Sequence, residues 1–386
     1  MKAKLPLWLW LVAVAALAIN LRAPLVAVSP VVNLIQQDLQ VSGAFMGLLA
    51  ALPIFCFAFF SPFVARLARR IGMERALLLS ILVLAIGIVI RSSAPTISAL
   101  LIGTLILSAA ISIGNVLLPA LAKRSVPHRV GLMIGVYTIS MSVSATIGAA
   151  IAVPVAHWQN WQWSLGVWLL TVILAFVIWF YINRHSPRQS TNAQTNHSGS
   201  VWRLPAAWLI SLFFGLQSLV FYATMNFMPS ALLEKGVSQF AAGNYGSLFQ
   251  LTGLLSTILI SWAFGRSRRK PQLTAFFSLL FLIGVTGLWL GSADLVWLWV
   301  SLAGIGTSVF SIALMILPMR TSSTEQATQL SGMAQTVGYG IAALGPLGVG
   351  IISDVMGSWS EAMSVLAFLL VVQTILSWLV AKPKPI

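Results

Sequence analysis

The chain has 386 residues, of which 59% are hydrophobic and 8% are charged, and its formal net charge is +15. A water-soluble fold of this composition would have too few polar side chains to cover its surface, which excludes a soluble enzyme or binding domain. The Lys and Arg residues lie in short breaks between apolar runs, whereas a nucleic-acid-binding protein would gather them on one soluble face. We therefore expect the lipid bilayer, and no nucleic acid, as the chain's surroundings.

Twelve apolar runs follow one another along the chain, each long enough to cross a bilayer as a helix. They lie at residues 7–30, 43–65, 76–93, 97–121, 131–156, 162–183, 205–230, 240–263, 273–291, 295–319, 329–353 and 360–380. The runs lack the alternation of polar and apolar residues that a β-barrel strand shows. The sequence therefore predicts an all-α membrane protein with twelve transmembrane helices.

A polar segment at residues 184–204, rich in Ser, Asn and Gln, divides the runs into two sets of six and is expected to be a cytoplasmic linker. The predicted domains are an N-terminal six-helix bundle over residues 1–183 and a C-terminal six-helix bundle over residues 205–386. Two pseudo-symmetric bundles related by an axis along the membrane normal are the layout of one class of secondary transporter.

The two halves of the sequence show a weak internal repeat. An offset of 197 residues relates Gly135 to Gly332, and the same offset relates Gly148 to Gly345. This repeat supports a duplication of one six-helix unit.

Basic residues are concentrated in every second loop between the apolar runs. The opposite loops hold only Arg91 and Lys235 as basic residues, together with Asp38, Glu234, Asp294, Asp354 and Glu361. Short cytoplasmic loops retain Lys and Arg during insertion. We therefore expect a multi-pass protein of the bacterial inner membrane with both termini in the cytoplasm.

Arg22 lies fifteen residues beyond the start of the first run, which is roughly 22 Å along a helix. A charge at that depth costs at least ~2.5 to 3.5 kcal/mol, so it should face the bundle interior and find a partner there. The interiors of the runs offer no Asp or Glu, so the expected counter-charge is a substrate anion. The alternative is a structural arginine bonded to backbone carbonyls. A planar guanidinium suits a small carboxylate, and Lys would not reproduce that geometry.

Other polar side chains inside the runs are expected to complete a substrate site, because an unpaired amide or hydroxyl in lipid is costly. They are Asn20, Asn115, Tyr137, Gln217, Tyr222, Asn226, Gln250, Gln335 and Tyr339. Tyr222 with Asn226, and Gln335 with Tyr339, are pairs four residues apart that share a helix face. The alternative for each residue is an interhelical hydrogen bond that only holds the bundle together.

Four stretches of the sequence resemble one branch of a known family. They are NLRAP at residues 20–24, GNVLLPALAKRSVPH at 114–128, QSLVFYATMNFMPSAL at 217–232 and SGMAQTVGYGIAALGP at 331–346. Through them the whole chain resembles the cyanate porter and nitroimidazole transporter branch of the major facilitator superfamily. The resemblance implies alternating access by two rocking bundles, one substrate site between them, no cofactor and no ATP hydrolysis.

The superfamily's loop after the second span usually reads Gly, Asp, Arg, Gly and a basic pair. This chain reads LARRIGMER over residues 67–75, so Arg69 stands where the acid is expected. The turn glycine Gly72 and the basic residues Arg70 and Arg75 are retained. The resemblance implies a conformational loop here. The contact between a charged side chain and a helix that is attributed to this loop lacks its usual acid.

The sequence as a whole predicts a secondary transporter, not an enzyme. Its expected substrate is a cyanate-like anion, a small carboxylate, or a small polar heterocycle such as a nitroimidazole. A broad-specificity drug or metabolite exporter of the same fold is the alternative, and an intramembrane enzyme or a channel is less favoured. Proton coupling, exchange and facilitated diffusion stay open, and the fold normally works as a monomer.

Overall fold

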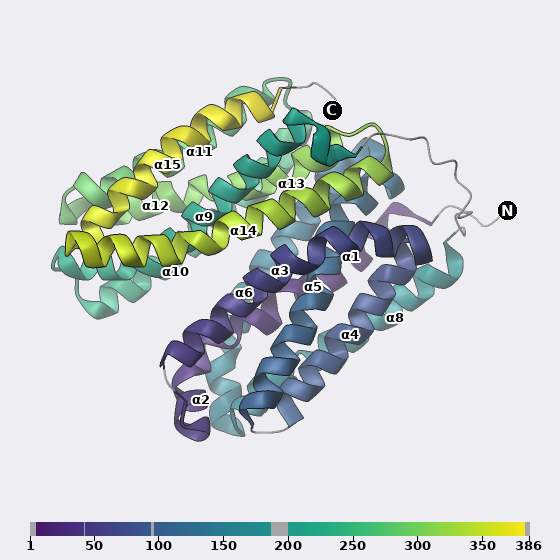
Figure 1. Cartoon of the computed structure of the whole chain (residues 1–386), viewed down its shortest axis with the longest axis horizontal. Coiled ribbons are helices and arrows are strands. Elements are labelled where there is room, and N and C mark those ends of the chain that lie inside the picture. Colours follow the sequence, from purple (N-terminus) through teal and green to yellow (C-terminus); the bar gives the residue numbers. More distant parts are fainter. Residues whose placement is uncertain (1–4, 42, 94–95, 187–199, 383–386) are drawn as a thin grey trace. The chain divides into compact units, whose positions relative to one another are not determined.

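The computed structural model describes residues 5–41, 43–93, 96–186 and 200–382 (Figure 1). Most of the expected cytoplasmic linker, residues 187–199, lies outside the described residues. The described part of the chain folds into helices joined by short connections.

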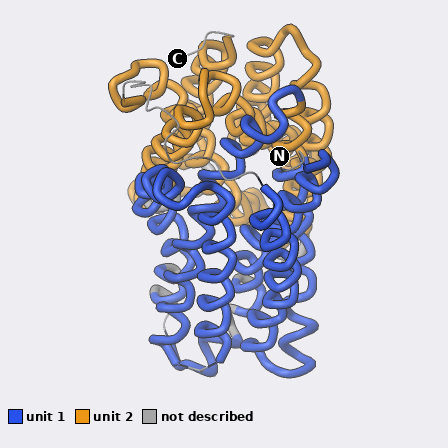
Figure 2. Tube along the Cα trace, turned by 90° about the vertical axis from the view of Figure 1, so that its right-hand side faces the viewer, with its two compact units in different colours: residues 1–128, 136–199 blue, residues 129–135, 200–386 orange. Residues whose placement is uncertain are grey.

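The chain divides into two compact units, each described here by itself (Figure 2). Unit 1 comprises residues 1–128 and 136–199, and unit 2 comprises residues 129–135 and 200–386. The first turns of one long helix, residues 130–135, are thus grouped with unit 2, although the remainder of that helix belongs to unit 1.

Unit 1 is a bundle of long helices with short helical segments at their ends. Its elements are α1 (Leu7–Val26), η1 (Ser29–Val31), α2 (Val32–Leu39), α3 (Gly43–Ile71), α4 (Met73–Ser93), α5 (Ile97–Ser125), η2 (Pro127–Arg129), α6 (Val130–Trp158), α7 (Trp161–Gly166) and α8 (Leu169–His185). Helix α5 packs against α1, α3 and α4, and α8 packs against α1 and α4. Helix α4 also packs against α3 and α7, so α4 and α5 together contact most helices of this bundle.

Unit 2 is likewise a bundle of long helices with short helical segments. Its elements are η3 (Val201–Arg203), α9 (Pro205–Glu234), α10 (Gln239–Arg266), α11 (Lys270–Leu290), η4 (Ala293–Leu295), α12 (Val296–Gly306), α13 (Val309–Met319), α14 (Thr324–Met356) and α15 (Trp359–Val380). Helix α9 packs along α14 and α15, and α11 packs between α12 and α15. Phe249, Phe281 and Leu366 are buried in the core that these helices share.

Each of the twelve predicted apolar runs falls on a helix or on a pair of consecutive helices. Eleven segments of the described residues are long and apolar enough to cross a membrane. The remaining run, residues 329–353, lies within α14, which has 33 residues and is about 50 Å long at 1.5 Å per residue. The prediction of an all-α fold with twelve transmembrane helices is confirmed.

Three runs differ in detail from the prediction. The sixth run is divided between α7 and α8, and the tenth is divided between α12 and α13. The first run is predicted to reach residue 30, but α1 ends at Val26. The reason is local, because Pro30 has no N–H to donate to the carbonyl oxygen of Val26, four residues earlier, and its ring would crowd that carbonyl in a continued α-helix.

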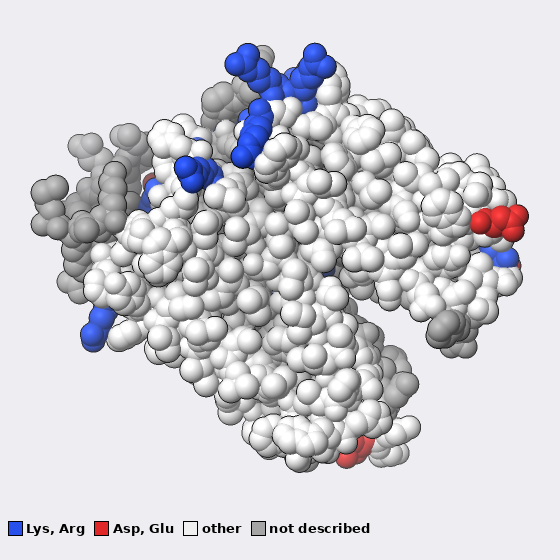
Figure 3. Space-filling model, turned by 180° about the vertical axis from the view of Figure 1, so that it is seen from behind, with Lys and Arg blue, Asp and Glu red and all other residues white. Residues whose placement is uncertain are grey.

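The flanks of both units carry exposed apolar side chains, including Phe59 and Leu170 in unit 1 and Leu259 and Trp262 in unit 2. On the face shown in Figure 3, the Lys, Arg, Asp and Glu side chains lie mostly near the outline of the molecule, and the broad area between them is almost uncharged. Exposed apolar surface of this extent is what a lipid-facing protein requires.

Two glycines let helices cross closely at related places in the two units. A Cβ atom at Gly148 of α6 would lie 3.2 Å from the carbonyl oxygen of Ala23 in α1, and one at Gly345 of α14 would lie 2.8 Å from that of Leu219 in α9. Small residues at such crossings allow membrane helices to approach. The glycines that share the offset of 197 residues therefore also share a packing role.

Candidate functional site

Arg22 lies in α1, four residues before the helix ends, and its side chain is half-buried. After α1 the chain still packs against unit 1 through Ala27, Val31 and Ile35, which have no exposed surface, while Pro30 is exposed. Among the described residues, the Arg22 guanidinium has no hydrogen bond or ion pair to a protein group. A guanidinium in this state is available to a ligand anion.

Arg91 is a second arginine inside unit 1, and the expectation that it lies in an outer loop is wrong. It belongs to α4 and its side chain is fully buried. Its Nη1 donates to the carbonyl oxygen of Pro24 at 2.9 Å, and its Nη2 lies 3.4 Å from that of Leu165. Arg91 therefore has the structural role that was the alternative for Arg22. No pattern in the sequence relates Arg91 to Pro24, because 67 residues separate them.

Asn20 and Gln217 are both fully buried amides, and both contact a threonine beside a helix break. Asn20 Nδ2 donates to the carbonyl oxygens of Ala16 at 2.8 Å and Thr171 at 3.2 Å, and its Oδ1 accepts from Thr171 Oγ1 at 2.7 Å. Gln217 Nε2 donates to the carbonyl oxygen of Thr307 at 3.5 Å. The two amides thus connect α1 and α9 to the interrupted helices, as the alternative of an interhelical hydrogen bond predicted.

Asn115 and Tyr137, two further candidates, lie together inside unit 1. Tyr137 Oη donates to Asn115 Oδ1 at 3.0 Å, and both side chains are buried. Asn115 comes from α5 and Tyr137 from α6. The structure therefore brings two sequence-predicted residues into one hydrogen-bonded pair between neighbouring helices.

Three candidates of unit 2 have accessible side chains. Tyr222 is half-buried, with its ring edge-on to Phe221 at 5.3 Å between centroids. Asn226 of α9 and Gln250 of α10 are exposed. An amide that faced hydrocarbon would lose its hydrogen bonds to water, so exposed amides in apolar helices indicate a water-accessible face.

Helix α10 carries two further exposed polar residues that the sequence analysis did not single out. Asn244 and Ser247 are exposed and precede Gln250 at intervals of three residues. This spacing places the three residues along adjacent turns of one side of the helix. The interval of three was the signal in the sequence that could have identified them.

Gln335 and Tyr339 lie in the packed interior of unit 2. Both are buried, and Gln335 Nε2 donates to Ser331 Oγ at 3.2 Å. The Tyr339 ring is perpendicular to that of Phe214 in α9, with 5.6 Å between centroids. Tyr339 therefore packs against α9, whereas Gln335 bonds to a residue of its own helix, α14.

A comparison with protein families identifies the fold. The family described as the Major Facilitator Superfamily matches residues 9–346. The chain belongs to the Major Facilitator Superfamily. It is therefore a multi-pass membrane transporter and not an enzyme.

Three bacterial members of the superfamily are similar to the chain over nearly its whole length. An uncharacterized transporter of Bacillus subtilis (strain 168), YycB, is 37% identical over 94% of this chain and 91% of its own. The 2-nitroimidazole transporter of Escherichia coli (strain K12) is 35% identical over 96% and 94%. The cyanate transport protein CynX of the same organism is 25% identical over 90% and 91%. These relatives confirm the branch of the superfamily that the four sequence stretches resemble.

Solved structures of superfamily members share the fold at low sequence identity. The proton:xylose symporter XylE bound to 6-bromo-6-deoxy-D-glucose superposes with a TM-score of 0.81 at 11% identity, covering 98% of this chain and 97% of its own. A variant of the E. coli fucose:proton symporter FucP gives a TM-score of 0.78 at 12% identity, covering 96% and 98%. At these identities the likeness concerns the fold alone.

The superfamily loop after the second span is a single residue long here. Gly72, with φ +89°, joins the end of α3 to the start of α4, and a Cβ atom there would meet no atom within 4 Å. Glycine is therefore favoured at this position by the left-handed backbone conformation and not by a lack of space. Arg69, Arg70 and Arg75, the other predicted members of the conformational loop, are exposed around it.

An acid near this loop forms an ion pair that the sequence analysis did not predict. Glu74, in the first turn of α4, accepts hydrogen bonds from both Nη atoms of Arg124 in the last turn of α5. Both side chains are largely buried, with 14% and 17% of their surface exposed. A bidentate pair of this kind fixes orientation as well as distance. It connects the ends of two neighbouring helices within unit 1.

Lys235, the other cation expected in the outer loops, also binds backbone carbonyls. Its Nζ donates to the carbonyl oxygens of Trp289 and Gly291 at 2.9 Å each, at the end of α11. A cation at this position compensates the unpaired carbonyls of a helix C-terminus. Burial lowers the pKa of the Lys235 amine. Both cations that the sequence assigns to the outer side thus bind helix-end carbonyls.

Proposed function

We propose that this member of the superfamily is a secondary transporter of the bacterial inner membrane for a small anion or a small polar heterocycle. The substrate class comprises cyanate-like anions, small carboxylates and nitroimidazoles. Transport occurs by alternating access, and both termini lie in the cytoplasm. The single observation that supports this proposal best is the half-buried guanidinium of Arg22, which has no partner among the described protein groups.

The contrast with Arg91 supports a ligand role for Arg22. Arg91 is also inside unit 1, but its guanidinium binds two backbone carbonyls and has no exposed surface. A cation in the membrane that lacks such contacts is costly unless another group offsets its charge. A substrate with a carboxylate or a comparable pair of acceptor atoms can supply that group through two parallel hydrogen bonds.

The names of two relatives support a small polar substrate. One is named as a transporter of 2-nitroimidazole, and another as a transport protein for cyanate. Cyanate carries a negative charge, and a nitroimidazole presents nitro oxygens and ring nitrogens that accept hydrogen bonds. A guanidinium can donate to either compound.

The remaining candidates have two different roles in this proposal. Tyr222, Asn226 and Gln250 are accessible and supply further hydrogen bonds and one aromatic surface to the substrate. The buried candidates hold the helices that carry the ligands, and Asn20 acts directly on the helix of Arg22. The buried set comprises Asn20, Asn115, Tyr137, Gln217, Gln335 and Tyr339.

Counterflow in proteoliposomes tests the proposal. Purified wild type, Arg22→Lys and Arg22→Ala are compared for exchange of labelled cyanate, benzoate and 2-nitroimidazole, with Arg203→Lys as control because Arg203 is exposed outside the spans. We expect saturable exchange of at least one compound by wild type and the control, and a loss of roughly tenfold or more in both Arg22 variants.

The melting temperature of each variant distinguishes loss of binding from loss of fold. We expect both Arg22 variants to melt within a few degrees of wild type, since neither substitution removes a hydrogen bond or ion pair among the described protein groups. Undiminished transport of these compounds by Arg22→Lys and Arg22→Ala would reject the arginine-centred site. In that case a broad-specificity exporter of the same fold would be the better description.

A further inference from the structure

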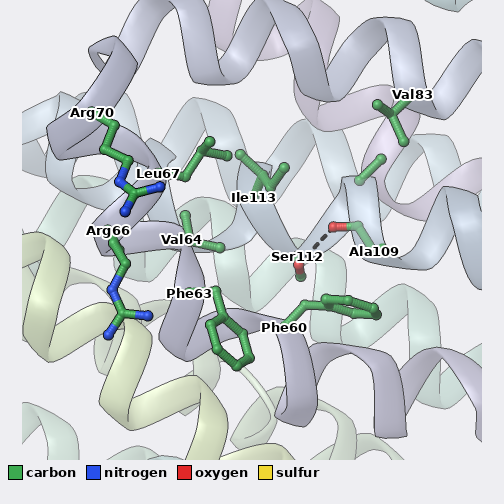
Figure 4. A pocket seen from close by; sticks show the side chains of 11 residues that line it. Phe60, Phe63, Val64, Arg66, Leu67, Arg70, Val83, Ala109, Ser112 and Ile113 are labelled. Carbon is green, nitrogen blue, oxygen red and sulfur yellow. Dashed lines mark hydrogen bonds between the residues drawn. The ribbon is translucent and has the colours of Figure 1, made fainter.

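A groove with a volume of about 340 Å³ lies on unit 1, where α3, α4 and α5 meet. Phe60, Phe63 and Leu67 of α3 line it together with Val83 of α4 and Ile113 of α5, and Figure 4 shows Leu67 beside Ile113, with Phe60 and Phe63 apart from them. None of the candidate substrate residues lines it. Phe63 is half exposed, so the groove opens on the outside of the bundle.

Apart from two arginines, the described side chains that line the groove offer no free hydrogen-bonding group. Ser112 is the one other polar side chain that lines it, and its hydroxyl donates to the carbonyl oxygen of Ala109 at 2.7 Å, as the dashed line in Figure 4 shows. A hydroxyl satisfied by its own helix leaves an apolar surface. The groove therefore suits a hydrocarbon chain and disfavours a polar solute.

Arg66 and Arg70 stand at one end of the groove. They are four residues apart on α3, which ends at Ile71, and both are exposed. Figure 4 shows both side chains extending from the same side of the helix. Neither guanidinium has a hydrogen bond or ion pair to a protein group among the described residues. Two unpaired guanidinium groups one helical turn apart suit a phosphate, which accepts bidentate hydrogen bonds.

We propose that this groove binds one anionic phospholipid of the cytoplasmic leaflet. An acyl chain lies along Phe60, Phe63 and Leu67, and the phosphate lies between Arg66 and Arg70. The charge and the apolar surface are complementary to the two parts of one molecule, because a free anion would use the arginines and leave the groove empty. Basic residues at the cytoplasmic ends of membrane helices attract anionic lipids. The proposal is independent of the substrate assigned to Arg22.

Native mass spectrometry of the purified full chain tests this site. The protein is incubated with phosphatidylglycerol or with phosphatidylcholine, and the retained lipid is counted for wild type and for Arg66→Gln/Arg70→Gln. The matched control is Arg268→Gln/Arg269→Gln, which removes two exposed arginines from the connection between α10 and α11. We expect wild type and the control to retain one phosphatidylglycerol, and the groove variant to bind it roughly tenfold more weakly.

A second variant tests the acyl part of the site without changing charge. Ala109→Leu adds three carbon atoms to the groove wall and keeps both arginines, so we expect weaker retention of phosphatidylglycerol at unchanged melting temperature. Inorganic phosphate at equal concentration should not displace the lipid. Equal retention by wild type and both groove variants, equal retention of phosphatidylcholine, or displacement by phosphate would overturn the proposal.

Discussion

Arg91 Nη1 donates a hydrogen bond to the carbonyl oxygen of Pro24 at 2.9 Å, two residues beyond Arg22. On the other side of Arg22, two residues earlier, Asn20 is held by Thr171. The segment of α1 that carries the candidate ligand is thus fixed on both sides by partners from α4 and α8. Such support restricts the position of a guanidinium whose own side chain has no partner among the described protein groups.

Removal of the Arg91 side chain should destabilise unit 1. In Arg91→Ala the carbonyls of Pro24 and Leu165 lose their donors, which costs about 1 to 3 kcal/mol for each buried group. We expect a clear fall in melting temperature in detergent, and a smaller fall for Arg91→Lys, which can retain one hydrogen bond. Arg75→Ala serves as control because Arg75 is exposed. A melting temperature for Arg91→Ala equal to that of the control would contradict the assigned role.

Three glycine-to-alanine substitutions should change the free energy of unfolding in different directions. A Cβ atom at Gly345 would lie 2.8 Å from a carbonyl oxygen of α9, so Gly345→Ala should destabilise the protein by about 1 to 3 kcal/mol. At Gly148 the nearest atom is 3.2 Å away, and the effect should be smaller. At Gly340 no atom lies within 4 Å, so alanine should stabilise the helix by roughly 0.5 to 1 kcal/mol. Thermal unfolding of the three variants checks this order, and any other order would show that the close helix crossings do not govern packing.

The Glu74 and Arg124 pair should show a measurable coupling. Both side chains are largely buried and joined by two hydrogen bonds, so we expect a coupling free energy of about 1 kcal/mol, the upper end of the range for exposed pairs. A double-mutant cycle with Glu74→Gln and Arg124→Gln measures it by unfolding in detergent. The coupling should decrease only slightly at high salt, because salt screens a largely buried pair much less than an exposed one. Additive effects of the two substitutions would mean that the pair contributes orientation without stability.

Stability should depend on pH through Lys235. Burial lowers the pKa of its amine from the ordinary value of 10.5. Between the folded pKa and 10.5 the unfolded chain binds more protons at this site than the folded chain, so stability rises with pH in that window. The melting temperature of wild type relative to Lys235→Met should therefore increase as pH rises toward that value. A difference between the two proteins that stays constant with pH would contradict a lowered pKa.

The sequence predicted the number and class of the helices well. Each span satisfies its backbone hydrogen bonds internally, so length and apolar composition are sufficient to locate it. The interruptions at Val167 and Thr307 and the early end of α1 were not predicted. The two interruptions lie beside contacts of Asn20 and Gln217 with distant threonines, which leave no local pattern. The early end of α1 has a local cause instead, the proline at position 30.

The candidate site was only partly predictable for the same reason. Polar residues inside apolar runs can be identified from the sequence, since lipid excludes them unless they have a partner or a function. Which of these two applies depends on the neighbouring helices. Asn226 and Gln250 are exposed, whereas Gln335 is buried and bonded to Ser331.

Composition and hydropathy alone determined that this chain is a helical membrane protein with twelve spans, because the bilayer imposes length and apolarity on every span separately. Only the tertiary structure decided the different roles of Arg22 and Arg91. The partners of Arg91 are 67 and 74 residues away, and the environment of a charge depends on whatever the fold places beside it.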